Sequence, residues 1–239
     1  MIEYHDVIAT TMDRATELVA AGRPDGAVVV ADHQTAGRGR RGRGWGYGPA
    51  GSLLLASWIL RIEDRLAPLF TVLAAVALLR AARGLGVEGL SVKWPNDLWL
   101  SGRKVAGALS VNVQDGRGGR WLVLGTGVDT HTRDHPEEVR DALTSFAHEG
   151  YDVDRLALLA QLAPALETLL DGGDAARLEA MAEWRRASNV LGRRVSIEDG
   201  ARRFEADAVD LDADGALMVR NERGGLERVV AGDVSLRPA

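Results

Sequence analysis

The chain has 239 residues, of which 46% are hydrophobic, so it is long enough to bury a core in one moderate domain with a smaller one beside it. A net charge of −5 argues against a general polyanion binder, and the lack of cysteine excludes disulfides, thiol catalysis and zinc–thiolate sites. The N-terminus is polar rather than signal-like, and no apolar run approaches the ~20 residues that a membrane-spanning helix needs. We therefore expect a cytoplasmic protein without a membrane segment.

Hydrophobic periodicity predicts strands and helices that alternate over the first 186 residues. The expected strands are Tyr4–Ala9, Ala27–Ala31, Leu53–Leu60, Leu90–Trp94, Asp97–Leu100, Lys104–Val113 and Trp121–Val128. The expected helices are one that Thr10 or Thr11 caps and Gly22 closes, one from about Ala67 to Arg83, and two near Asp154–Leu170 and Asp174–Arg186. The second helix is apolar nearly all round, which is typical of a helix buried behind a sheet.

The pattern changes after Asn189, where short apolar pairs recur between Asp-Gly and Gly-Gly turns. These pairs are Val195/Ile197, Leu217/Val219, Val229/Val230 and Val234/Leu236. The spacing predicts a small all-β barrel of about 50 residues. We therefore expect two domains, 1–188 and 189–239.

A glycine- and arginine-rich segment separates the second and third expected strands. Positions 37–48 hold six glycines and four arginines, and no acidic residue lies between Asp32 and Glu63. A disordered basic linker or an RGG-like nucleic-acid segment is one interpretation. The buried strands on either side favour a lid that orders over an anionic ligand, since arginine suits phosphate and carboxylate and glycine allows close approach.

Two more motifs follow, Val92-Lys93-Trp94-Pro95-Asn96-Asp97-Leu98 and Arg103-Lys104-Val105-Ala106-Gly107. Together with Gln34 and the lid, they resemble the signature motifs of biotin protein ligases. The family's Gly-Arg-Gly-Arg-x-Gly-Arg-x-Trp pattern is matched at every fixed position from Gly37 to Trp45. The resemblance extends from Thr10 to the closing Gly232-Asp233-Val234-Ser235-Leu236-Arg237.

This resemblance implies an α+β fold, in which a mixed-sheet catalytic domain of the biotin/lipoate ligase type precedes an SH3-like β-barrel. It implies ATP- and Mg²⁺-dependent ligation of biotin, through biotinyl-5′-AMP, to a lysine of a biotin carboxyl carrier domain. The motifs begin at Thr10, so we expect a ligase without a DNA-binding domain, as a monomer or homodimer. A lipoate or octanoate ligase of the same fold is an alternative, although those enzymes lack the lid pattern. A non-enzymatic RNA-binding protein is another, and steep salt dependence would be its signature.

Lys104 and Arg40 are the residues to which the resemblance gives catalytic roles. It implies that the Lys104 ammonium bridges the biotin carboxylate and the α-phosphate, and that Arg40 holds the adenylate. Strand alternation would point Lys104 and Ala106 to the same face. A solvated surface lysine is the alternative for Lys104.

The remaining candidates divide by ligand. The resemblance implies biotin contacts from Thr10, Thr11, Gln34, Arg38, Gly39, Arg40 and Lys104, and nucleotide contacts from Arg40, Arg43, Trp45, Asn96, Asp97, Gly107 and Arg237. Asp97 is also a candidate Mg²⁺ ligand. Ordinary packing for Trp45, turn capping for Asn96 and Asp97, and helix capping for Thr10 are the structural alternatives. A solvent-facing side chain is the alternative for Arg41 and for Arg43.

Two positions depart from the family pattern. Met12 stands where the family often has Asn after the Thr pair, and Asp129 replaces Asn in Gly125-Thr126-Gly127-Val128-Asp129. Aspartate removes two donors and adds charge, so a contact from this position to a nucleotide is in question. The five histidines show no spacing typical of a metal site.

Overall fold

A seven-stranded mixed sheet forms the larger part of this computed structural model, which describes residues 1–62, 67–200 and 202–236. In spatial order its strands are β1 (Ile2–Ile8), β2 (Ala27–Gln34), β3 (Leu53–Arg61), β7 (Arg120–Asp129), β6 (Arg103–Gln114), β5 (Asp97–Leu100) and β4 (Ser91–Lys93). Strands β1 and β2 are parallel and the other neighbours antiparallel. The mixed sheet expected from the sequence is confirmed.

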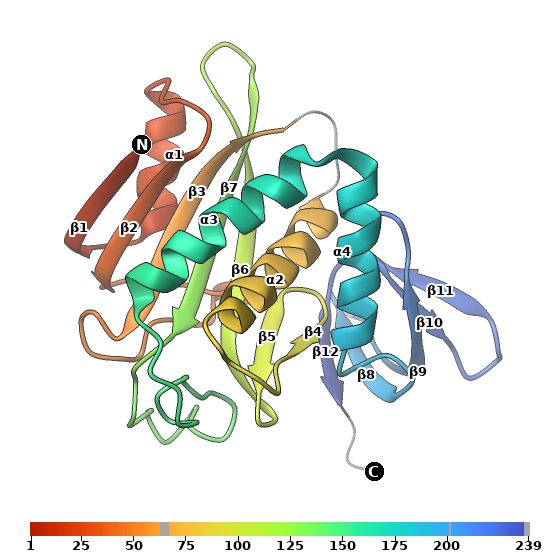
Figure 1. Cartoon of the computed structure of the whole chain (residues 1–239). Coiled ribbons are helices and arrows are strands. Elements are labelled where there is room, and N and C mark those ends of the chain that lie inside the picture. The colour runs from red at the N-terminus through yellow and green to blue at the C-terminus, as the bar shows by residue number, and fades with distance from the viewer. Residues whose placement is uncertain (63–66, 201, 237–239) are drawn as a thin grey trace.

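Helices cover both faces of this sheet. Helix α1 (Thr11–Ala20) packs on one face, while α2 (Ala67–Gly84) and α3 (Arg155–Asp171) cross the other (Figure 1). Side chains of β2 therefore alternate between two cores: Ala27 and Val29 lie in the α1 cluster, and Val28 and Val30 in the α2 cluster. A strand buried on both faces shows a continuous apolar run instead of an alternating pattern, which is what the sequence shows here.

The C-terminal part is a five-stranded antiparallel sheet, called the small sheet below. Its order is β11 (Leu226–Val229), β10 (Leu217–Arg220), β9 (Arg202–Leu211), β8 (Arg194–Asp199) and β12 (Asp233–Leu236). Strand β9 was not predicted, because two of its inward positions, Ala206 and Ala208, are alanines that give a weak hydrophobic alternation. The all-β character is confirmed, and pairing within the described residues runs from β11 to β12 as an open sheet instead of a closed ring.

Helix α4 (Gly173–Ala187) joins the two sheets, and one continuous hydrophobic core runs beneath both. Trp184 of α4 is fully buried in that core. Trp94 is also buried, and its indole Nε1 donates a hydrogen bond of 3.0 Å to the carbonyl of Gly215, in the turn between β9 and β10 of the small sheet. The division at residues 188 and 189 stays a prediction, since the packing is continuous across it.

Residues 130–149 form a long excursion between β7 and α3. Its backbone forms hydrogen bonds with both polar backbone groups of Lys104. Lys104 N–H donates to the Ala142 carbonyl at 2.9 Å, and Thr144 N–H donates to the Lys104 carbonyl at 2.9 Å. Glu149 closes the excursion by accepting from Arg103 at 2.6 Å. Among the described helices, none is long and apolar enough to cross a membrane.

Candidate active site

A cavity of about 530 Å³ lies where the lid, the β4–β6 edge of the large sheet and the small sheet meet. Every candidate residue that the structure describes lines it, namely Thr10, Thr11, Gln34, Arg38, Gly39, Arg40, Arg43, Trp45, Asn96, Asp97, Lys104 and Gly107. Arg237 lies outside the described residues. Residues spread over almost a hundred positions of sequence are thus gathered at one concave surface, the usual form of a small-molecule site.

One end of the cavity is a hydroxyl and amide network at the start of α1. Gln34 Oε1 accepts from both the backbone N–H and the hydroxyl of Thr11, at 2.7 and 3.0 Å. The Thr11 hydroxyl is also 2.8 Å from the hydroxyl of Ser57, a fully buried residue that the sequence analysis missed. Thr10 caps the helix by accepting from Asp13 N–H at 3.1 Å and also lines the cavity, so the cap is confirmed and the biotin contact stays a prediction.

Lys104 reaches the cavity through an irregularity in its strand. The β5–β6 register shifts so that Asp97 faces Gly107, while Trp99 faces Lys104. The Lys104 ammonium consequently lies beside Gly107, where a Cβ would be 2.8 Å from Nζ, and Ala106 packs into the core instead. The expectation that Lys104 and Ala106 share a face was wrong, because a bulge breaks the two-residue period.

The Lys104 ammonium lies near a carboxylate and an aromatic ring. Its Nζ is 2.7 Å from Asp97 Oδ1 and 4.9 Å from the centroid of the Trp45 ring. The ion pair fixes the direction of the side chain, and the aromatic ring lies on the lid side of the charge. Lys104 is therefore a positioned ammonium at the cavity wall and not a freely solvated surface lysine.

The lid is folded across the cavity. Arg38 and Gly44 form an antiparallel bridge, with Gly39 N–H donating to the Arg43 carbonyl at 2.7 Å and Trp45 N–H donating to the Gly37 carbonyl at 3.1 Å. Arg38 pairs with Asp13 at the start of α1. The segment is a small closed loop and not an extended basic linker.

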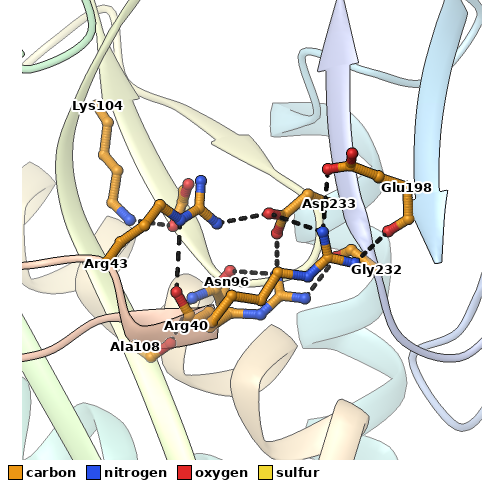
Figure 2. Close-up of polar contacts among 10 residues, drawn as sticks. Arg40, Arg43, Asn96, Lys104, Ala108, Glu198, Gly232 and Asp233 are labelled. Atoms are coloured by element: carbon orange, nitrogen blue, oxygen red, sulfur yellow. Dashed lines mark hydrogen bonds and ion pairs between the residues drawn. The ribbon is translucent and has the colours of Figure 1, made fainter. Parts of the chain in front are cut away.

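Arg40 and Arg43 converge on one carboxylate of the small sheet, Asp233 (Figure 2). Arg40 Nη1 is 3.3 Å from Asp233 Oδ1, and Arg43 Nη2 is 2.6 Å from Oδ2. Burial lowers the pKa of Arg40, and the negative charge of Asp233 acts against that shift. The sequence analysis gave Asp233 no role, although it stands in the closing motif that carried the resemblance.

Asn96 supports the same arginine from the turn between β4 and β5. Its Nδ2 donates to the Ala108 carbonyl at 2.5 Å, which leaves Oδ1 to accept from Arg40 Nη1 at 3.3 Å (Figure 2). These contacts differ from a turn cap, so Asn96 orients a cation at the cavity. Asp97 thus contacts Lys104 and Asn96 contacts Arg40, the two residues for which the resemblance implies catalytic roles.

Among the described residues that line the cavity, five are cationic and three are anionic, so positive charge exceeds negative by two. One cation, Lys93, was not among the candidates; its ammonium is 4.3 Å from the centroid of the Trp99 ring. Burial lowers the pKa of Lys93. A surplus of positive charge in a concave site raises the local concentration of anionic ligands.

The two departures from the family pattern have different outcomes. Met12 is buried in the α1 cluster and lines the cavity. Asp129 is absent from the lining; its Oδ1 accepts from Thr132 N–H at 3.0 Å and its Oδ2 is 2.8 Å from His135 Nε2. Asp129 therefore fixes the start of the 130–149 excursion.

Comparison with known proteins identifies the family. Residues 4–129 match the Biotin/lipoate A/B protein ligase family, and residues 190–237 match the Biotin protein ligase C terminal domain. The biotin–[acetyl-CoA-carboxylase] ligase of Mycobacterium tuberculosis is 33% identical over 96% of this chain and 87% of its own length. The bifunctional ligase/repressor BirA of Escherichia coli is 30% identical over 95% of this chain and 70% of its own length.

A solved structure agrees in both sequence and shape. The biotin protein ligase from Aquifex aeolicus in complex with biotin and ATP is 27% identical, covers 100% of this chain and 99% of its own, and gives a TM-score of 0.83. The two matching segments carry the large and the small sheet that enclose the cavity. The chain therefore belongs to the biotin/lipoate A/B protein ligase family, as one of its biotin protein ligases.

Proposed function

We propose that this biotin ligase joins biotin to a lysine of a biotin carboxyl carrier domain in two steps within the cavity described above. In the first step the biotin carboxylate attacks the α-phosphorus of ATP, forming biotinyl-5′-AMP and releasing pyrophosphate. In the second, the acceptor amine attacks the acyl carbon and AMP leaves. The Mycobacterium tuberculosis ligase, the Escherichia coli ligase/repressor and the Aquifex aeolicus complex with biotin and ATP support this assignment.

The observation that carries the proposal is the position of Lys104. Its ammonium lies at the cavity wall, held by Asp97, with Arg40 and Arg43 on the lid nearby. Two anions must approach each other for the carboxylate to reach the phosphate, and a fixed cation between them offsets their repulsion and the charge that develops in the transition state. We assign this bridging role to Lys104, and to Arg40 the stabilisation of the phosphoryl oxygens.

The hydroxyl and amide network is the proposed site for the biotin head group. A ureido ring has donors and acceptors, and Thr11, Gln34 and Thr10 supply both kinds of group. Arg38 and Gly39 line the same cavity, and we assign them to the biotin as well. We assign the nucleotide to the part of the cavity near Arg43, Trp45, Asn96 and Gly107.

Mg²⁺ fits as an ion that ATP brings with it. The described residues hold no group of three metal-ligating side chains, whereas Mg²⁺ in nucleotide sites takes one or two carboxylates and completes its shell with phosphates and water. Asp97 is the carboxylate at the cavity that we assign to it. The ion would supply further neutralisation of the triphosphate.

Incubation with ATP, Mg²⁺ and biotin followed by mass spectrometry tests the proposal. We expect biotinyl-5′-AMP and release of pyrophosphate that depends on biotin. Lipoate and octanoate are the matched controls, and release with either of them but not with biotin would overturn the assignment. A purified carrier domain added to the mixture should gain the mass of one biotinyl group, and its acceptor lysine→Arg variant should not.

A further inference from the structure

Arg41 differs from the other arginines of the lid in the direction of its side chain. Arg38, Arg40 and Arg43 line the cavity, whereas Arg41 does not. Its backbone has a φ of 55°, in the left-handed region that non-glycine residues rarely adopt. The side chain reaches strand β8, where Nη1 is 3.0 Å from Glu198 Oε2 and Nη2 donates to the Glu198 carbonyl at 2.7 Å.

The surface that receives Arg41 has two carboxylates on neighbouring strands. Glu198 of β8 and Asp233 of β12 face each other directly in the register of the small sheet (Figure 2). Like charges at opposed positions of an antiparallel pair destabilise it. Arg41 Nη1 lies near both, 3.0 Å from Glu198 and 3.7 Å from Asp233, so its cation offsets the repulsion. We call Glu198 and Asp233 the acidic pair.

We propose that Arg41 is a positioning residue that latches the lid onto the acidic pair and so determines how long the closed lid retains biotinyl-5′-AMP. The inference rests on the proposed function. An anionic ligand offers Arg40 and Arg43 phosphate oxygens that compete with Asp233. Arg41 does not line the cavity, although Glu198 does. The contacts between Arg41 and Glu198 involve neither Arg40 nor Arg43, so they persist whichever partner those two arginines hold.

The exposure of the two side chains limits the size of the effect. Arg41 is 36% exposed and Glu198 is 50% exposed, so water and salt screen their attraction. An exposed ion pair stabilises the state in which it forms only slightly. Because Arg41 makes two contacts with Glu198, we expect its contribution to lie near the upper end of the range for exposed pairs. Loss of the latch should therefore speed release of the adenylate about three- to fivefold, and added salt should reduce the difference.

The test compares release of preformed biotinyl-5′-AMP from the parent, Arg41→Gln, Glu198→Gln and the double variant. Each single variant should release it about three- to fivefold faster, and the double variant no faster than the singles, because one contact is lost in all three. In Arg41→Gln, whose side chain does not line the cavity, the amount of adenylate formed per enzyme in a single turnover should stay at the parental level. A merely structural role would instead lower that amount or the melting temperature and leave the release rate unchanged.

Arg202→Ala is the matched control, since Arg202 pairs with Glu227 on the same sheet at 2.8 Å and does not line the cavity. Its release rate should equal that of the parent. Hydrogen exchange of residues 37–48 without ligand gives a second measurement, and Arg41→Gln should speed it. Parental release together with parental exchange in Arg41→Gln would overturn the latch while the proposed function stands. If the parent forms no adenylate, the proposed function fails, and hydrogen exchange alone then decides the latch.

Discussion

Trp45 and Gly127 lie so close together that only a hydrogen fits between the lid and the central strand β7. A Cβ at position 127 would be 2.1 Å from Trp45 Nε1 and 2.8 Å from Cδ1. The indole N–H is buried without a hydrogen-bond partner among the described residues. The lid can therefore close over the cavity because β7 presents bare backbone at this position.

Gly127→Ala should keep the lid from closing, because the added methyl group occupies the place of the indole. Retention of biotinyl-5′-AMP should fall about tenfold or more, measured as its release rate from the purified variant. Trp45→Ala provides the control: once the indole is gone, adding Gly127→Ala should change the release rate no further. A large additional effect in the double variant would mean that the methyl group acts on something other than Trp45.

Lys104→Ala should greatly slow adenylate formation while the protein still folds. Removal of one charge that stabilises a transition state typically costs about 10²–10³-fold in rate. Biotin-dependent pyrophosphate release reports the loss, and the melting temperature reports the fold. Asp97→Asn is the informative companion, since it leaves the lysine but removes the carboxylate 2.7 Å from Nζ. Near-parental turnover by Lys104→Ala would remove this residue from the catalytic assignment.

Arg40→Gly should still form some biotinyl-5′-AMP but hold it weakly. An acyl-adenylate is a reactive anhydride, and a side chain that binds its phosphate keeps it from water and from unintended amines. Adenylate that escapes should acylate exposed lysines, so serum albumin mixed with enzyme, biotin and ATP should become biotinylated, as a blot would detect. If the variant makes adenylate at the parental rate and labels albumin no more than the parent, the retaining group is another arginine.

Asp129→Asn should gain stability relative to the parent as pH rises. Burial raises the pKa of Asp129 above its ordinary value of 3.8, so the native state binds a proton at pH values where the unfolded chain has lost it. Stability then falls as pH rises through the raised pKa, and the amide variant lacks this loss. Its melting temperature relative to the parent, followed over a pH series that starts at 3.8, should increase as pH rises. The exposed Asp134→Asn should show no such difference, and an equal trend in both would contradict the assignment.

Much of this architecture was predictable because its signals are local. The Val28–Val30 run, the cap at Thr10 and the apolar helix over 67–83 each depend on a few neighbouring residues, and each corresponds to an element of the structure. Strand β9 was missed because small inward side chains such as Ala206 hardly distinguish one face from the other. The bulge beside Lys104 was missed because alternation assumes an unbroken strand.

Prediction of the site was limited by contacts between distant parts of the chain. The motifs identified the cavity residues on the lid and on the strands, yet they gave no reason to connect Arg40 with Asp233, which lies far along the sequence. Ser57 and Glu198 have no motif of their own, so only the fold reveals that they support Thr11 and Arg41. The acidic pair follows from a register that the sequence does not state.

The hydrogen bond from the Trp94 indole to the Gly215 carbonyl has an evolutionary consequence. It ties the small sheet to the residue that comes two positions before Asn96, so a change near Gly215 would displace the cavity wall although every cavity residue remained intact. A chimera that exchanges residues 189–239 between relatives would have to bring a carbonyl to Trp94 as well as a carboxylate to Arg40. Recombination within this lineage should therefore preserve the two sheets as a single inherited unit.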